Sequence, residues 1–324
     1  MLKKILISVA MLFSFLDAKD DYQMGHGYQL GDTPLYLGGY LAARYDINHG
    51  EQEFDLDDVA VLLYGSFEKF DFLSEIEASD VTFEKEGKRD YDLANSTFHI
   101  ERLYVTIPLK DDASVHFGKF NTDIGFWNQT PINVLHDTTT PPHIMTDLFP
   151  KLTTGIGYIK SINDNFSLSL ALQHNHDIDD EFNNLFVKQH YNFSIKNTQD
   201  SYTWGVAGGY FKEKNDQSST YATVGIQKEF EKWTLLSEVY SRVTDDAPSV
   251  PYDIYLQGTW HFKDKHDIAF RTETYNDEIE DSSDTVGLIG YTYRPYPFMA
   301  IKGEFEAHSI ERLSHAVFSF SVIF

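Results

Sequence analysis

Apolar and polar residues alternate along most of the chain, from Leu35 to Phe324. In the segment 165–174, for example, phenylalanine or leucine occupies every second position from residue 166, and the residues between are small or polar. A period of two residues is typical of a β-strand with one apolar and one polar face, whereas the apolar positions of a helix recur every three to four residues. The pattern therefore predicts an all-β chain.

Sixteen segments show this alternation. They span residues 35–46, 54–67, 70–81, 96–108, 113–121, 153–161, 165–175, 184–196, 201–212, 219–230, 232–243, 251–262, 266–276, 284–294, 297–308 and 313–324. Most are 9–14 residues long. This exceeds the roughly 5–6 residues usual in soluble proteins and matches the roughly 10 residues of a tilted membrane strand.

The connections alternate between tight turns, such as 68–69 and 295–296, and longer polar loops, such as 82–95 and 276–283. Short turns at one rim and long loops at the other are typical of outer-membrane barrels. Closure also avoids an unpaired strand edge in lipid. The sequence therefore predicts a transmembrane antiparallel up-and-down β-barrel of about 16 strands, with 14 or 18 as alternatives and both termini at the periplasmic rim. A soluble β-sandwich or β-helix would have shorter strands and less regular rims.

The first residues differ from the rest of the chain. Lys3 and Lys4 precede an apolar run, Ile5–Leu16, and the small residue Ala18 follows. These features are typical of a cleavable export signal, and the run is shorter than the roughly 20 residues of a membrane-spanning helix. A buried N-terminal helix is the alternative. We expect residues 1–18 to be the signal, 19–34 a short periplasmic segment and 35–324 the barrel in the outer membrane.

Composition narrows the classes of partner. The chain has no cysteine and a formal net charge of −24. This charge repels nucleic acid, and the absence of thiols excludes disulfides and thiolate metal sites. Aromatic residues make up 15% of the chain, which does not fit disorder. We expect outer-membrane lipid and lipopolysaccharide as partners, no nucleic acid, and no cofactor or metal.

The last strand ends in an aromatic residue, with apolar residues at every second position before it. This ending resembles the C-terminal strand that the barrel assembly machinery recognises in outer-membrane proteins. Phe320, Val322 and Phe324 are the expected assembly signal. With Phe318, they are predicted to face lipid, while Ser319 and Ser321 face the lumen.

The longest connection covers about residues 121–152 and is the third external loop in this topology. Loops beyond about 15 residues are usually functional or disordered, and this one holds many large apolar residues, such as Trp127 and Phe149, which argues against disorder. Its position resembles that of the third loop in general porins of sixteen strands. That resemblance implies a loop folded into the lumen, a narrowed channel and a homotrimer.

Three motifs around this loop resemble porin-like proteins grouped near the phosphate-selective porins. They are Gly118-Lys119-Phe120, Gly125-Phe126-Trp127-Asn128 and the Phe149–Gly155 segment, which reads Phe-Pro-Lys-Leu-Thr-Thr-Gly. The resemblance covers about 40 residues, and Ile124 stands where that group has proline. The predicted lumen is not basic, so phosphate selectivity is not expected.

Charged residues occupy the polar faces of the predicted strands at middle heights. They are Glu75, Glu77, Arg102, Lys188, Glu238, Arg271, Glu273, Lys302, Glu304 and Glu306. Acids outnumber bases, which enriches cations in the lumen; a merely solvated wall is the alternative. The candidates for the constriction are Asp123, Asp137, Asp147, Glu75, Arg102, Glu238, Arg271, Lys302 and Glu304.

A second polar cluster contains His174, His176, Asp177, Asp179 and Asp180, in a predicted external turn. These residue types can bind a divalent cation. Their spacing matches no defined site, so a solvated acidic loop is the favoured interpretation. Asn276–Asp284 is acidic in a similar way.

Signs of catalysis are weak. Serines and histidines such as Ser314 and His315 are present, but no nucleophile elbow accompanies them. The sequence therefore predicts a non-enzymatic porin that lets small hydrophilic solutes or ions diffuse passively, with mild cation preference. The alternatives are a substrate-specific porin, a barrel enzyme, or a structural or adhesive surface barrel.

Overall fold

The structure of the protein is a computed structural model that describes residues 25–48, 51–78, 81–85, 98–146, 148–179, 184–310 and 313–324. The predicted export signal, residues 1–18, lies outside these residues, as do Asp147 and Asp180. Within them, no helix is long and apolar enough to cross a membrane.

The described residues form eighteen strands and three 3-10 turns. The strands are β1 (Tyr28–Gln29), β2 (Leu35–Asn48), β3 (Glu51–Ser66), β4 (Asp71–Ala78), β5 (Val81–Lys85), β6 (Phe98–Pro108), β7 (Ala113–Asn121), β8 (Leu152–Ser161), β9 (Phe166–Gln173), β10 (Val187–Thr198), β11 (Tyr202–Glu213), β12 (Ser218–Glu229), β13 (Trp233–Thr244), β14 (Val250–Lys263), β15 (His266–Asp277), β16 (Ser282–Tyr296), β17 (Met299–His308) and β18 (His315–Ile323). The 3-10 turns are η1 (Trp127–Gln129), η2 (Asn133–Leu135) and η3 (His143–Met145).

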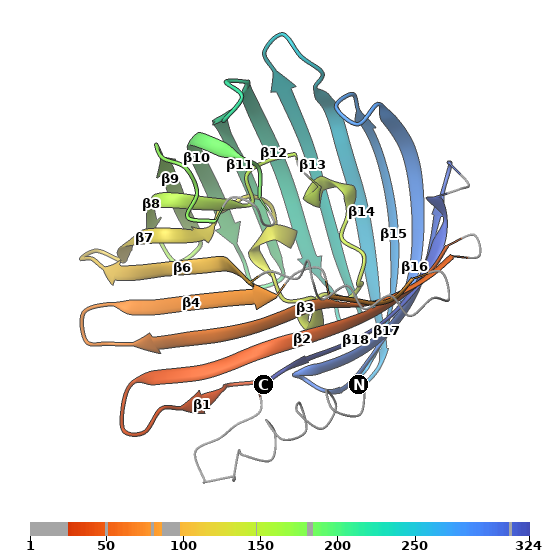
Figure 1. Ribbon diagram of the computed structural model, residues 1–324, viewed down its shortest axis with the longest axis horizontal. Helices are drawn as coiled ribbons and strands as arrows, with labels where there is room; N and C mark the ends of the chain where they lie inside the picture. Colours follow the sequence, from red (N-terminus) through yellow and green to blue (C-terminus); the bar gives the residue numbers. More distant parts are fainter. Residues whose placement is uncertain are drawn as a thin grey trace.

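The strands form one closed antiparallel sheet (Figure 1). Each long strand pairs with the next along the chain, and β18 pairs with β2 to complete the ring. The strands β4 and β5 both pair with β3 and follow each other along the same line, so they count as one strand of the wall. The two-residue strand β1 pairs with β2 and is not counted as a strand of the wall. The wall therefore contains sixteen strand positions, and the predicted all-β barrel is confirmed.

The predicted strand limits agree closely with the observed ones. The segment 113–121 matches β7 at both ends, and the segment 284–294 lies inside β16. Of the segment 19–34, which we expected to precede the barrel, residues 25–34 are described. Part of it, Tyr28–Gln29, pairs with Leu37 and Tyr36 of β2. The backbone of this edge-like segment thereby finds hydrogen-bond partners at the rim.

The outward faces of the strands are apolar. Leu172, Ile289 and Phe305 are each about half exposed, at 55%, 51% and 51%. Residues on the opposite face are polar and buried, such as Glu238 at 1% and Glu304 at 5% exposure. A soluble protein buries its apolar residues instead. This inverted arrangement is typical of a barrel whose outer face contacts lipid.

Both ends of the barrel wall lie at the rim that carries the tight turns. The Phe324 backbone forms two hydrogen bonds of 2.9 Å with Gly39, one in each direction. A Cβ atom at Gly39 would lie 2.7 Å from the Phe324 ring, so the ring covers this glycine. Phe318 and Phe320 are exposed on the outer face, at 54% and 37%. Val322 shares that face and is 8% exposed.

The connection between β7 and β8 carries all three 3-10 turns and lies inside the curve of the sheet in Figure 1. Four of its apolar residues, Ile124, Ile144, Leu148 and Phe149, belong to a buried hydrophobic cluster. Their partners come from the walls and include Val187, Phe211, Tyr221, Tyr240, Val250 and Tyr255. The apolar content of this connection is thus used in packing against inward-facing aromatic residues.

Candidate functional site

The connection of residues 122–151, called the inner loop below, contacts the wall through charged side chains. Glu238 of β13 is the first of them and is 1% exposed. Its Oε1 atom accepts a hydrogen bond from the Phe126 backbone N–H at 2.8 Å, and its Oε2 atom accepts one from the Tyr255 hydroxyl at 2.5 Å. Gly125 has a φ of +64°, and a Cβ there would lie 2.3 Å from Glu238 Oε1. Only glycine fits this approach.

Two buried cations hold the middle of the inner loop. Lys302 Nζ donates hydrogen bonds to the Asn133 carbonyl at 2.5 Å and to the Thr138 carbonyl at 3.1 Å. Arg271 Nη1 donates to the Thr140 carbonyl at 2.8 Å. Both side chains are 3% exposed. Carbonyl groups in an irregular segment need such partners, because buried backbone groups without hydrogen bonds are costly.

Glu304 of β17 binds the neighbouring N–H groups. Its Oε1 atom accepts hydrogen bonds from the Thr140 N–H and hydroxyl, both at 2.6 Å, and its Oε2 atom accepts one from the Thr139 N–H at 3.1 Å. Hydrogen bonds to charged groups are worth more than neutral ones, typically about 1.5–3 kcal/mol. Glu304 therefore holds this part of the inner loop on the wall.

Asp137 lies in the inner loop and is held from β14 and β16. Its carboxylate accepts a hydrogen bond from the Thr259 hydroxyl at 2.7 Å and forms an ion pair with Arg294 at 3.2 Å. Arg294 also donates to the His136 carbonyl at 2.6 Å. We call the residues Glu238, Arg271, Arg294, Lys302 and Glu304 the loop-bound wall. Their charges are occupied by the inner loop or by one another.

The other end of the loop is held at His143. Its backbone N–H donates to Glu273 at 2.9 Å, and its Nδ1 lies 2.8 Å from the Asp253 carboxylate. The imidazole stacks on Tyr275, with ring centroids 3.5 Å apart. No sequence pattern marks this residue, because its partners are more than 100 residues away along the chain.

The remaining candidates for the constriction lie elsewhere. Glu75 is fully buried and forms an ion pair with Arg102 as well as a 2.6 Å hydrogen bond from Tyr40. Asp123 accepts a hydrogen bond from Ser194 at 2.5 Å and lies 3.4 Å from Lys196. These carboxylates are therefore partly or fully neutralised by neighbours.

The acidic turn after β9 is structural in its described part. Asp177 is 8% exposed and accepts hydrogen bonds from Thr154 at 2.5 Å and from Asn184 at 3.0 Å. Asp179 is partly buried, which opposes ionisation. Hydrogen bonds from the Ile100 N–H and His99 outweigh this and hold its pKa below the usual range. The expectation of a simply solvated acidic loop is therefore wrong for these two residues.

The inner loop leaves space against the opposite side of the barrel. A cavity of about 290 Å³ lies between the loop and the strands β2, β3 and β6. Its charged lining consists of Arg44, Asp57, Asp58 and Glu101, with Lys151 at the end of the loop. We call Arg44, Asp57, Asp58 and Glu101 the open wall. None of the four was among our candidates.

Two irregularities of the sheet explain the omission of Asp57 and Glu101. The pairing of β2 with β3 shifts at Ala42 and Ala43, whose partners are Asp58 and Leu56, so Asp57 is an extra residue. The pairing of β4 with β6 shifts in the same way and leaves Glu101 as the extra residue. A β-bulge breaks the strict alternation of faces. It therefore brings an acid to the lumen that alternation would assign to lipid.

A second cavity, of about 200 Å³, lies between the inner loop and strands β12, β13 and β14. Trp127, Thr130 and His136 line both cavities. Trp127 and His136 stack with their ring centroids 3.9 Å apart. Burial, and after it the positive charge of Lys302, lowers the pKa of His136 to about 3. This imidazole is therefore neutral at ordinary pH.

Comparisons with solved structures identify the class of fold. OmpF of Salmonella typhi, in a complex with daunomycin, is 13% identical, with 90% of this chain and 97% of that chain covered and a TM-score of 0.67. The anion-selective porin from Comamonas acidovorans is 10% identical, with 90% of this chain and 99% of that chain covered and a TM-score of 0.65. OmpT, an outer-membrane-expressed protein of Vibrio cholerae, is 9% identical, with 91% of this chain and 99% of that chain covered and a TM-score of 0.64.

At these identities the likeness shows the fold alone, a porin-like barrel of the kind found in outer-membrane proteins. No protein-family model matches the chain. A comparison with curated proteins also finds no match.

Proposed function

We propose that the chain is an outer-membrane porin that lets small hydrophilic solutes or ions diffuse passively, without catalysis. One observation carries this proposal. Buried charges hold the inner loop on one wall, and a polar cavity of about 290 Å³ remains against the other. A barrel that served only as a surface scaffold would not need this polar cavity between its inner loop and its wall.

The route we propose runs along the open wall and then past the loop into the second cavity. Trp127, Thr130 and His136 border both cavities, so on this proposed route a solute passes these three residues. The stacked rings of Trp127 and His136, with centroids 3.9 Å apart, lie where the two cavities meet the loop. We therefore place the constriction at this stack, and we assign the candidates Glu238, Arg271, Lys302 and Glu304 to holding the loop.

Mild cation preference is part of the proposal. The first cavity is lined by three acids, Asp57, Asp58 and Glu101, and by two bases, Arg44 and Lys151. Arg44 also forms an ion pair with Asp46 at 2.5 Å, which reduces its effect on a passing ion. Salt screens charges beyond roughly 8–10 Å, so residues at the cavity count more than distant ones. The field near the passage should thus favour cations modestly.

The location and partners belong to the same proposal. The apolar outer faces fit outer-membrane lipid, and Trp233 and Trp260 stack near the tight-turn rim with ring centroids 5.9 Å apart. Aromatic residues at a membrane interface are typical of such barrels. We propose contacts with lipopolysaccharide, insertion by the barrel assembly machinery and a homotrimer. A structure of Vibrio cholerae OmpT in a trimer form has the same fold, with a TM-score of 0.62.

Planar-bilayer recording of the purified chain tests this function. We expect stepwise single-channel currents and a reversal potential in a potassium chloride gradient that shows potassium preferred over chloride. The matched control is the Asp57→Asn/Asp58→Asn variant, which keeps the size of both side chains and should lose most of the preference. Absence of channel steps from folded protein would contradict the porin. Steps with chloride preference would contradict only the proposed selectivity.

A further inference from the structure

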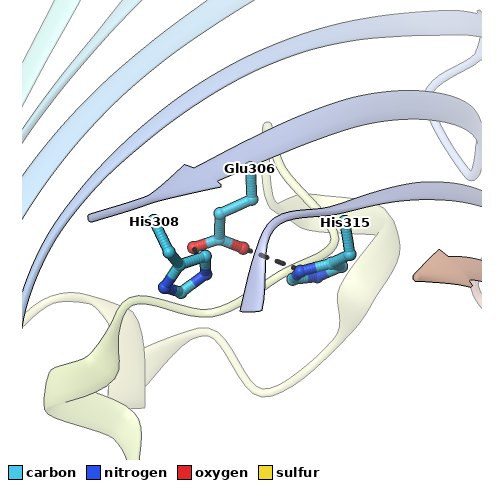
Figure 2. A group of neighbouring side chains, drawn as sticks. All are labelled: Glu306, His308 and His315. Carbon is cyan, nitrogen blue, oxygen red and sulfur yellow. Dashed lines mark ion pairs between the residues drawn. The ribbon is translucent and has the colours of Figure 1, made fainter. Parts of the chain in front are cut away.

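A separate cluster of side chains lies on the lumen side of the sheet, near the rim of the longer connections. Glu306 and His308 are on β17, and His315 begins β18 directly opposite Glu306 in the strand pairing. Figure 2 shows the two imidazole rings on either side of the Glu306 carboxylate. One ligand atom from each residue lies within 4.8 Å of the others.

The distances leave a gap at the centre of the cluster. His308 Nε2 lies 3.8 Å from Glu306 Oε1, and His315 Nε2 lies 3.7 Å from Glu306 Oε2. Hydrogen bonds between nitrogen and oxygen are about 2.7–3.2 Å long, so neither contact is one. Glu306 is 4% exposed, and its Oε2 atom has no hydrogen-bond partner among the described residues. A buried carboxylate oxygen in this state needs a hydrogen-bond donor or a cation.

The other ring nitrogens fix how the imidazoles are protonated. His308 Nδ1 lies 2.7 Å from the Asp284 carboxylate, and His315 Nδ1 lies 3.0 Å from the Leu313 carbonyl. Carboxylates and carbonyls only accept, so both Nδ1 atoms carry the hydrogen. In the neutral imidazoles, both Nε2 atoms then present lone pairs toward the Glu306 carboxylate. Three acceptor atoms thus face one another without a donor between them.

A metal ion would satisfy this arrangement. We propose that Glu306, His308 and His315 bind a divalent transition-metal ion of the zinc class. Two imidazoles and one carboxylate form a ligand set that such ions bind, with a fourth position left for water. Ligands at about 2.0–2.1 Å in a tetrahedron lie roughly 3.4 Å apart. The two nitrogen–oxygen contacts would shorten by a few tenths of an ångström, and the ligand atoms already lie within 4.8 Å of one another.

The surroundings resemble a metal site in a second respect. A histidine ligand usually donates its other N–H to a carboxylate or carbonyl, which fixes the ring. Asp284 does this for His308 and is itself held by the Thr285 N–H at 2.7 Å and the Ser309 N–H at 2.9 Å. The nearest cation, Arg271, lies 3.7 Å from Glu306 Oε1, so it offsets part of the charge but does not reach Oε2 by hydrogen bonding. This site does not depend on the proposed channel function.

The test uses the purified chain in detergent after removal of metals with a chelator. We expect calorimetric titration to show one Zn²⁺ bound per chain, and Co²⁺ to give the visible absorption of a tetrahedral site. The His315→Ala variant should bind Zn²⁺ at least about tenfold more weakly, and Asp284→Asn about 10–100-fold more weakly. Retained heat-modifiable gel mobility shows that each variant is folded.

The control removes a histidine pair elsewhere. His174→Ala/His176→Ala lies in the turn after β9 and should bind Zn²⁺ as the parent chain does. Excess Ca²⁺ should not displace the ion, because nitrogen ligands discriminate against it. Equal Zn²⁺ affinity of the parent chain and His315→Ala, loss of binding in the control variant, or displacement by Ca²⁺ would each overturn the proposal. So would a parent chain that binds no Zn²⁺.

Discussion

The two sides of the lumen use the same kinds of residue differently. On the loop-bound wall, Lys302 and Glu304 are nearly inaccessible, and their hydrogen bonds go to backbone groups of the inner loop. On the open wall, Asp57 is exposed and borders a cavity. A charge that binds a loop shapes the passage, whereas a charge that faces water sets the field within it. The number of charged residues in a lumen therefore does not by itself predict selectivity.

The loop itself offers the strongest way to test this difference. Deletion of residues 131–146 would remove the segment held by Arg271, Lys302 and Glu304, and with it His136, one of the three residues that border both cavities. We expect single-channel conductance to rise severalfold, because the narrowest part of the route is lost. The barrel should keep its heat-modifiable mobility, since strand pairing closes the wall. Unchanged conductance would mean that the inner loop lies outside the conducting route.

A matched pair of substitutions compares the walls directly. Glu304→Gln and Asp57→Asn each remove one negative charge from the lumen. Asp57→Asn should lower the preference for potassium, because its carboxylate borders the cavity. In Glu304→Gln, hydrogen bonds worth about 1.5–3 kcal/mol to a charged acceptor become neutral ones, so the inner loop is held less firmly. We therefore expect this variant to show more frequent brief closures of the current. Reversal potentials and closure frequencies of the two variants decide this. Indistinguishable effects would refute the distinction between the walls.

A smaller effect is expected from pH. The pKa of His136 is about 3 in the docked loop, well below the ordinary value of 6.5. When the inner loop leaves the wall, His136 takes up a proton more readily. Its neutral form therefore stabilises the loop on the wall above pH 6.5, and this stabilisation is lost as the pH falls toward 3. We expect closures to become more frequent over that range.

The control for this prediction is His136→Phe, which keeps an aromatic ring against Trp127 but cannot be protonated. Its closure frequency should change less between pH 6.5 and the lower limit of barrel stability. An equal pH dependence in the parent chain and in the variant would assign the effect to other groups.

Most of the wall could be predicted from the sequence, because the alternation of apolar and polar residues in each membrane strand shows which side faces lipid. The segment 232–243 differs from β13 by one residue at each end. Outward residues such as Phe305 and inward residues such as Glu238 were also assigned to the correct faces. Local alternation is sufficient here, since neighbours in the sheet are also neighbours along the chain.

The candidate site was less predictable for two physical reasons. Bulges insert Asp57 and Glu101 into their strands, and a bulge leaves no reliable mark in a pattern of alternating residues. The partners of the inner loop are also remote, as for Thr139 and Glu304, which are 165 residues apart. Sequence alternation shows that Glu304 faces inward, but it cannot show whether its carboxylate binds water or a loop.

Reaction of single cysteines with a cationic thiol reagent tests the central claim most directly. The chain has no cysteine of its own, so Asp57→Cys and Ser319→Cys each provide one thiol. Asp57 borders the cavity, whereas Ser319 is 6% exposed and lies 2.5 Å from the Thr139 hydroxyl of the inner loop. We predict that the reagent lowers the current through Asp57→Cys channels and leaves Ser319→Cys channels unmodified. Equal reaction at both positions, or reaction at residue 319 alone, would contradict a passage along the open wall.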